Sequence, residues 1–494
     1  MMRLRVSGSV LRPLSAYPAI AGLVIVALGI GWAIARAPVN YGLAVCVGVP
    51  LLAISAWEPA VGLGLAIILG PAKALLAVTY PAVPDLGQVF FVLALAGWLA
   101  RGLAGRRLVV AQNQLLVPLG LYLAVGLVSM LPAASLEEGL KEIVKWAEIV
   151  VALMIFLSEA QRGRLRWIVV AILMAGLAQA AAGVWEYQLR GIGPEHFRLA
   201  AGQYRAYGTF EQPNPYGGFL GLIWPLAAGL AFALASRTLH KARVRVSGWG
   251  RDLAGFAALA AATLVVVYGL YISASRGAWL GAAAAVLAMA LFLPRRLRLG
   301  VSLVIVALAA GWGLWQTGLL PASLTSRLAG AADFVNVSDV RGININDANF
   351  ALVERLAHWQ AAVSMAETHP WLGVGLGNYA TAYPAVRLLN WPNALGHAHN
   401  IYLNALAETG LAGLAAYVLL WAWVIALTIR VLNRTTGLER GLALGLLGAW
   451  AHLSAHQFVD DLYVNNVHFL IAGLLALLVY LSQRATRAGA PAGF

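Results

Sequence analysis

Long apolar runs constrain this chain more than any other feature. Runs of roughly 17–22 residues recur along its whole length, and each is about long enough to cross a hydrocarbon core of ~30 Å as a helix. With 61% hydrophobic and 11% charged residues, the chain of 494 residues is too apolar for an ordinary soluble domain. The sequence therefore predicts an all-α fold, a polytopic transmembrane helix bundle.

We expect 12–14 membrane spans within this bundle. The candidates are residues 17–35, 40–56, 59–77, 86–104, 114–132, 142–158, 167–186, 214–236, 253–273, 277–294, 300–319, 410–430, 441–459 and 464–482. Arg3, Arg5 and Arg12 precede the first run as in a signal peptide, but the run is long and no small-residue cleavage pattern follows it. We interpret it as an uncleaved span. The single cysteine, Cys46, excludes an internal disulfide and is expected to be a buried side chain.

Basic residues predict the orientation of the bundle. Of the 34 Lys and Arg residues, 22 fall in segments that alternate with the spans: 3–12, 101–107, 162–166, 237–251, 295–298, 430–440 and 484–487. The positive-inside rule places these segments, and both termini, in the cytoplasm. Because the net charge of +14 is spread between spans, it does not indicate a nucleic-acid surface.

Two segments predicted to lie outside the cytoplasm are long, 187–213 and 320–409. The second is long enough to contain helices of its own. Within it, residues 351–366 place Leu352, Leu356 and Val363, together with a tryptophan, at helical spacing. Such a helix either lies on the membrane surface or packs on the bundle.

Three arginines on the predicted outer side stand out. Arg205 lies in a turn-rich loop that leads to Asn214 at the start of a span, Arg276 lies in a tight junction between two spans, and Arg355 lies on the amphipathic segment. A guanidinium binds phosphate oxygens in bidentate fashion, and several together can hold a diphosphate. Each arginine taken alone fits equally well a structural ion pair or a contact with lipid headgroups, so only the set favours a phosphate site.

Histidines follow in the same outer segment. A glycine-rich stretch at 369–379 precedes His397, His399 and Asn400, and Asn400 opens a polar stripe that runs into a span. On a helix the two histidines would point roughly 200° apart, so one of them is expected to face a given site. Histidine can accept a proton near neutral pH and return it, and polar groups at a membrane span favour a functional role.

A second polar group, His452, His456 and Asp460, repeats at four-residue steps near the outer end of a span. Such spacing allows metal ligation, but hydrogen bonding within the bundle or support of the outer site is the favoured interpretation. The sequence contains no phosphate-binding loop, dinucleotide fingerprint or Cys/His zinc spacing. We expect no metal and no cofactor.

Taken in this order, the motifs resemble the bacterial O-antigen ligases and the wider group that shares a domain with them, the O-antigen polymerases and the O-linked protein oligosaccharyltransferases. The matching positions are Arg205 with Gly208-Thr209-Phe210 and Pro213-Asn214, Ser275-Arg276-Gly277, Arg355 with residues 369–379, and His399-Asn400. The likeness covers about residues 200–430, and the remainder resembles the family only as a scaffold of many spans.

The resemblance implies transfer of a glycan from an undecaprenyl-diphosphate carrier to an acceptor at the periplasmic face of the inner membrane, without a metal or a nucleotide sugar. For the ligases the acceptor is a sugar hydroxyl of lipid A–core. The essential histidine of the family falls on His399, and its diphosphate-binding arginines fall on Arg205, Arg276 and Arg355.

The chemistry of these residues agrees with that function. A base must remove the proton of a sugar hydroxyl during attack, and fixed guanidinium groups stabilise a departing diphosphate. We predict direct displacement with inversion at the anomeric carbon, and we include His397, Asn400 and Asn214 in the substrate site.

The expected organisation is an N-terminal transmembrane scaffold (1–200), a ligase-type core that includes the periplasmic loop 320–409 (201–430), and a C-terminal hairpin with a cytoplasmic tail (431–494). Two enzymatic alternatives stay open, an O-antigen polymerase and a protein O-oligosaccharyltransferase. A transporter of lipid-linked sugars would favour internal repeats and charges near the bilayer midplane, which the sequence does not display. The expected partners are the lipid-linked donor, lipid A–core and membrane lipids, and not nucleic acid.

Overall fold

The computed structural model describes residues 39–106, 113–199, 202–320, 325, 339–346 and 349–489. Regular structure within these ranges is helical, apart from an isolated β-bridge between Arg198 and Tyr204. This confirms the all-α fold class. The first predicted span, 17–35, lies outside the described residues.

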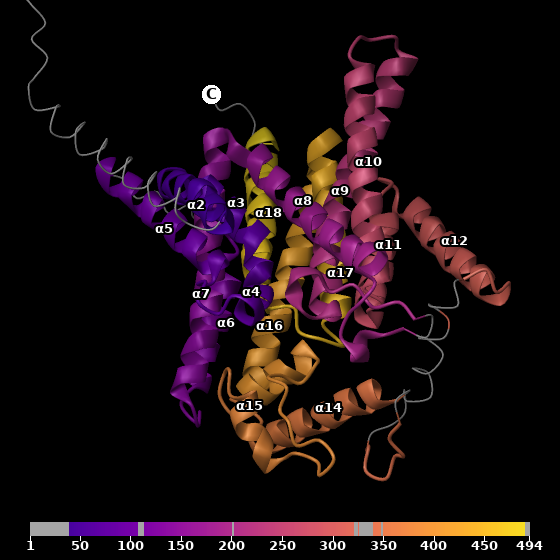
Figure 1. Cartoon of the computed structure of the whole chain (residues 1–494). Helices are drawn as coiled ribbons and strands as arrows, with labels where there is room; N and C mark the ends of the chain where they lie inside the picture. Colours follow the sequence, from indigo (N-terminus) through magenta and orange to yellow (C-terminus); the bar gives the residue numbers. More distant parts are fainter. Residues whose placement is uncertain are drawn as a thin grey trace, which may run out of the picture.

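The N-terminal half of the bundle contains seven helices in the described ranges. They are α2 (Val39–Trp57), α3 (Pro59–Leu69), α4 (Lys73–Thr79), α5 (Leu86–Ala104), α6 (Leu116–Ser129), α7 (Leu136–Glu159) and α8 (Leu165–Val184). The C-terminal half contributes α9 (Pro213–Arg243), α10 (Trp249–Ile272), α11 (Arg276–Phe292), α12 (Leu297–Gln316), α16 (Ile401–Arg434), α17 (Gly437–His456) and α18 (Val467–Gly489). Two further helices, α14 (Phe350–Thr368) and α15 (Tyr379–Ala382), lie together below one end of the bundle (Figure 1).

The remaining thirteen predicted spans each coincide with one of these helices, or with α3 and α4 together. Among the described residues, eight helical stretches are long and apolar enough to cross a membrane. One of them, Leu136–Arg190, is divided into α7 and α8 by Gly163, whose φ of 85° interrupts the helix. The chain is therefore a multi-pass membrane protein.

The centre of the bundle is formed by α9, α17 and α18. The most apolar segment of α18 is 72% buried inside the protein, whereas the corresponding segment of α12 is only 6% buried. Helix α12 stands apart at the edge of the molecule (Figure 1). Gly229 on α9 faces Gly441 on α17 so closely that a side chain on either would collide with the other backbone. Small residues thus bring the two helices together, as is common in membranes. Cys46, expected to be buried, is exposed on α2, where a small apolar side chain can face lipid.

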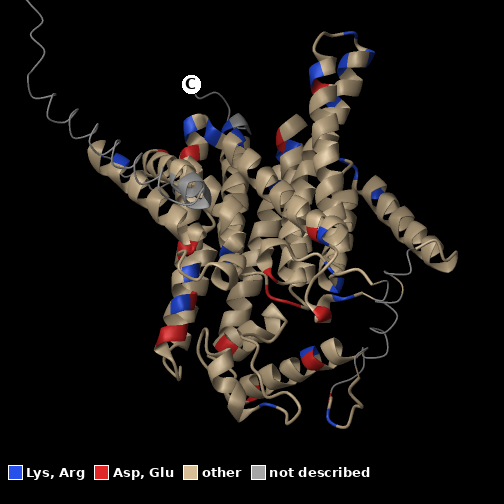
Figure 2. Cartoon of the chain, in the orientation of Figure 1, with Lys and Arg blue, Asp and Glu red and all other residues tan. Residues whose placement is uncertain are grey.

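The two ends of the bundle differ in charge. Lys and Arg residues gather at the end where α9 finishes and α18 terminates, while α14 and α15 cover the opposite end (Figure 2). The positive-inside rule predicts that the basic end faces the cytoplasm.

The amphipathic segment forms α14 and packs on the first turns of α16. Leu356 is buried as predicted, but Val363 is 40% exposed, because the buried face runs through Val353, Ala361 and Met365 instead. Two placements were predicted, on the membrane surface or packed on the bundle, and in the structure the helix packs on the protein.

Candidate active site

The glycine-rich stretch at 369–379 is held against a break in α16. Gly410 has a φ of 64° and a ψ of −166° and interrupts that helix. The backbone N–H of Val374 donates to the carbonyl of Ala407 at 2.9 Å, and a Cβ on Gly410 would collide with the backbone of Trp371. The stretch therefore acts as a scaffold that fixes the first turns of α16.

His399 lies in a strained loop directly before α16. Its φ is 51°, in the left-handed region that is uncommon for residues other than glycine. The backbone N–H of His399 donates to Nδ1 of His397 at 3.0 Å. Asn400 caps α16, because its side-chain oxygen accepts from the N–H groups of Tyr402 and Leu403. Contacts on both sides thus hold His399 in a conformation of higher energy, as is common at functional sites.

These contacts define what His397 and Asn400 do in this structure. His397 Nδ1 is an acceptor, so its ring is neutral with the proton on Nε2, and burial followed by the charge of His399 lowers the pKa of His397. Asn400 uses its oxygen as a helix cap. Both residues position His399, and their contact with substrate stays a prediction.

The imidazole of His399 faces Asp460. Its Nδ1 lies 3.5 Å from Oδ1 of Asp460, and neither ring nitrogen has a hydrogen-bond partner within the described part of the chain. The distance exceeds that of a good hydrogen bond, but acid–base contacts often shorten when substrate binds.

Asp460 is an anion in this setting. Burial alone would raise its pKa, but the contact with His399 and the electrostatic attraction to His397, His399 and Arg355 outweigh burial and hold the pKa of Asp460 well below its ordinary value. A buried carboxylate behind an imidazole orients the ring and stabilises its protonated form. The pair can therefore act as a general base and its support.

A further histidine, which was not predicted from the sequence, lies beside this pair. His358 on α14 packs edge-on against His399, with 5.7 Å between ring centroids, and is 1% exposed. The Tyr379 hydroxyl donates to the carbonyl of His358 at 3.1 Å, which leaves its oxygen to accept from His358 Nδ1–H at 2.9 Å. Burial, followed by the charges of His399 and His397, lowers the pKa of His358 to about 4, so the ring is neutral at pH 7.

Arg355 approaches the site from the same helix. Its Nη1 donates to the carbonyl of Ala351 at 3.3 Å, and its Nε is buried without a hydrogen-bond partner among the described residues. Its charge helps to lower the pKa of Asp460, so the two groups interact electrostatically.

Arg205 and Arg276 both lie at the junction between α10 and α11. Arg205 Nε donates to the carbonyl of Ser273 and its Nη2 to Oδ1 of Asn214, each at 2.9 Å. Arg276 is the first residue of α11, and Ser275 caps that helix. Asn214 therefore holds Arg205 in place, and its own contact with substrate stays a prediction.

A chain of contacts joins this junction to Asp460. A Cβ on Gly277 would lie 2.8 Å from Val459 Cγ2 and 2.9 Å from His456 Cδ2, so the start of α11 packs on the end of α17. Asp460 follows directly in the chain. The structure thus places the junction that carries Arg205 and Arg276 against the end of α17, directly before Asp460.

The polar group at the end of α17 separates into two parts. His456 Nδ1 lies 3.4 Å from His452 Nε2, and both rings are buried within the bundle, whereas Asp460 belongs to the site of His399. Among the described residues, the side chains close enough to one another to bind a metal ion together are instead those of His397, His399 and Asp460. Their ligand atoms lie within 4.8 Å of one another. Two imidazoles and a carboxylate are a donor set that suits zinc.

Comparison with known proteins bears on the same region. Residues 260–418 match the family model described as O-antigen ligase. The chain carries an O-antigen ligase family domain. Ligases, polymerases and oligosaccharyltransferases share this domain, so the protein is a membrane enzyme of lipid-linked sugar transfer. No curated protein matches the chain.

The O-antigen ligase domain contains part of the candidate site. Arg276, Arg355 and His399 fall inside the matched segment, and Arg205 and Asp460 fall outside it. The sequence provided no direct signal for the pairing of Asp460 with His399, because 60 positions separate them and a helix break and two spans intervene. No sequence signal pointed to His358, because it lies on the buried face that packing creates and not on the apolar stripe predicted for residues 351–366.

Proposed function

We propose that the protein is an O-antigen ligase that moves O-antigen polysaccharide from undecaprenyl diphosphate to a sugar hydroxyl of lipid A–core, at the periplasmic face of the inner membrane. The observation that carries this proposal is an imidazole, His399, whose nitrogens lack hydrogen-bond partners among the described residues and which faces a buried carboxylate at 3.5 Å. The matched domain supports the reaction class, and three arginines near the loop after α17 support a diphosphate donor.

In the proposed reaction His399 is the general base. The acceptor hydroxyl oxygen attacks the anomeric carbon while Nε2 of His399 takes the hydroxyl proton. Asp460 stays ionised beside Nδ1 and stabilises the imidazolium that forms. Both ring nitrogens are shielded from solvent before substrate enters, so the acceptor has to displace the neighbouring side chains to reach Nε2.

The bond between the anomeric carbon and the diphosphate oxygen breaks with its electron pair on the diphosphate. Arg205, Arg276 and Arg355 would stabilise that developing charge more than they stabilise the bound donor. The imidazolium then releases its proton to water. One displacement without a covalent glycosyl intermediate gives inversion at the anomeric carbon, and retention in the product would reject this step.

The contact between His399 and Asp460 favours a functional core with wider bounds than expected. The functional core was placed at residues 201–430, but a role for Asp460 extends it into the C-terminal segment. We propose that residues 1–200 and the rest of 431–494 support this core.

Pairing of purified protein with defined substrates tests the proposal. Protein in nanodiscs is given an undecaprenyl-diphosphate glycan with lipid A–core, with a second lipid-linked glycan, or with a serine-containing peptide. We expect glycosylated lipid A–core and released undecaprenyl diphosphate in the first mixture only. Product in the second mixture alone would assign a polymerase, product in the third alone a protein transferase, and movement of labelled carrier across the membrane without covalent product a transporter.

A further inference from the structure

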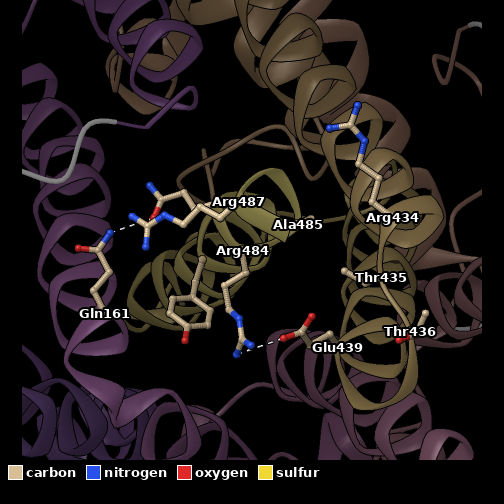
Figure 3. A pocket seen from close by; sticks show the side chains of 10 residues that line it. Gln161, Arg434, Thr435, Thr436, Glu439, Arg484, Ala485 and Arg487 are labelled. Carbon is tan, nitrogen blue, oxygen red and sulfur yellow. Dashed lines mark hydrogen bonds and ion pairs between the residues drawn. The ribbon is translucent and has the colours of Figure 1, made fainter. Parts of the chain in front are cut away.

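A cavity of about 580 Å³ lies at the end of the bundle opposite His399 (Figure 3). It opens among the turn after α7, the connection between α16 and α17, and the last turns of α18. Helix α16 begins beside His399 and ends at Arg434 in the cavity, and the part after the break at Gly410, residues 411–434 at 1.5 Å each, alone spans about 36 Å. The cavity is therefore distinct from the candidate active site.

The cavity lining carries an excess of positive charge. Arg434, Arg484 and Arg487 line the cavity together with a single carboxylate, Glu439, and Arg484 Nη1 lies 3.1 Å from Oε1 of that glutamate. Arg434 and Arg487 form no hydrogen bond or ion pair with the part of the chain that the structure describes. Three guanidinium groups and one carboxylate leave the lining two positive charges in excess.

Some other basic residues at this end of the bundle are used within the fold. Arg162 and Arg164 both pair with Glu159, which is buried, and Lys241 lies 2.7 Å from Asp252. The cavity is distinguished by three arginines that line one space beside a single carboxylate, Glu439.

The chemistry of the lining selects a phosphate group. Guanidinium groups bind phosphate oxygens in bidentate fashion. The cavity is also lined by Thr436, the residue before α17, whose side chain makes no capping hydrogen bond and whose hydroxyl can bind a phosphate oxygen. Neutral glutamine and threonine side chains on the remaining wall offer further hydrogen bonds to ester oxygens.

The position of the cavity selects a lipid as the source of that phosphate. Part of the lining comes from the last turns of α16 and α18, two helices long and apolar enough to cross a membrane, so the cavity lies at the end of their apolar stretches, where headgroups are expected. Basic pockets between transmembrane helices on the cytoplasmic side suit phospholipid headgroups. We propose that this cavity binds the phosphodiester headgroup of an anionic phospholipid of the cytoplasmic leaflet.

Lipid binding to the full chain tests this site. Native mass spectrometry of the detergent-purified protein, titrated with phosphatidylglycerol, measures the dissociation constant. Near a membrane surface each basic residue contributes about 1 kcal/mol, which is about fivefold in affinity. Arg434→Gln and Arg487→Gln should each weaken binding about fivefold, while Arg430→Gln, one turn earlier on α16 and outside the cavity, should leave it unchanged.

A substitution that removes the negative charge of the cavity distinguishes an effect on lipid binding from an effect on protein stability. Glu439→Gln removes the carboxylate that competes for Arg484 and should tighten binding by a similar factor. Phosphatidylethanolamine and inorganic phosphate should bind at least tenfold more weakly than phosphatidylglycerol. The proposal is overturned if the arginine variants bind like wild type, if Glu439→Gln weakens binding, or if inorganic phosphate competes as well as the lipid. None of these outcomes depends on glycan transfer.

Discussion

Acidification should destabilise the outer end of this protein through one buried side chain. His358 is 1% exposed, and burial with the charges of His399 and His397 lowers its pKa to about 4 from an ordinary value of 6.5. Between pH 6.5 and 4 the unfolded chain therefore binds a proton at this position that the folded chain does not. Because the unfolded state binds more protons there, stability falls as pH falls, and the contribution is fully present above pH 6.5.

The two pKa values give the size of the effect. From pH 7.5 to 5.0 this histidine alone should lower the free energy of unfolding by ~2 kcal/mol. His358→Asn removes the titrating ring, while its amide nitrogen can occupy the place of Nδ1 beside the Tyr379 hydroxyl. We expect the variant to be less stable than wild type at pH 7.5 but to lose ~2 kcal/mol less on acidification.

Reversible unfolding in mixed micelles, followed by tryptophan fluorescence at both pH values, measures this difference. His369→Asn, at an exposed position just after the same helix, is the matched control and should keep the wild-type response to pH. Equal pH responses in wild type and His358→Asn would refute the reasoning, because the buried ring would then carry no differential proton binding.

Three further predictions follow from the site. Asp460→Asn should lower the rate of glycan transfer roughly 10²–10⁴-fold with unchanged membrane insertion, since the imidazolium loses its counter-charge, and a rate within twofold of wild type would contradict the pairing. Gly410→Ala should lower the free energy of unfolding by about 3 kcal/mol, because the backbone there is left-handed and the added Cβ would collide with the backbone of Trp371. Gly120→Ala, which has open space around it, is the control and should not destabilise the protein. Equal stability of the two variants would contradict the packing of the helix break. Chelation by EDTA should leave transfer unchanged, and activity lost on chelation and restored by zinc would assign His397, His399 and Asp460 as metal ligands.

Much of the fold could be predicted because membrane spans are defined by local composition. The apolar runs gave helices with bounds close to those expected, for example α10 at Trp249–Ile272 for residues 253–273. The amphipathic pattern of residues 351–366 gave a helix, but its buried face is rotated toward Val353 and Ala361. Helix formation follows from nearby residues, while the buried face depends on what packs against it.

The candidate site was predictable only in its local parts. His397 and His399 stood out together because they precede a polar helix start, and the choice of His399 rested on the family resemblance. Asn400 at that start is a capping residue by type. The partners of His399 come from α14 and from the loop after α17, and their approach depends on how distant helices pack. The glycine-rich stretch was prominent in the sequence, yet its backbone is used to hold the break at Gly410.

The rate of glycan transfer by purified His399→Gln protein, compared with wild type at equal membrane insertion, tests the central claim most directly. If His399 is the base that takes the acceptor proton, product formation should fall by at least about 10²-fold while the lipid-linked donor still binds. Transfer within a few fold of the wild-type rate would contradict the account.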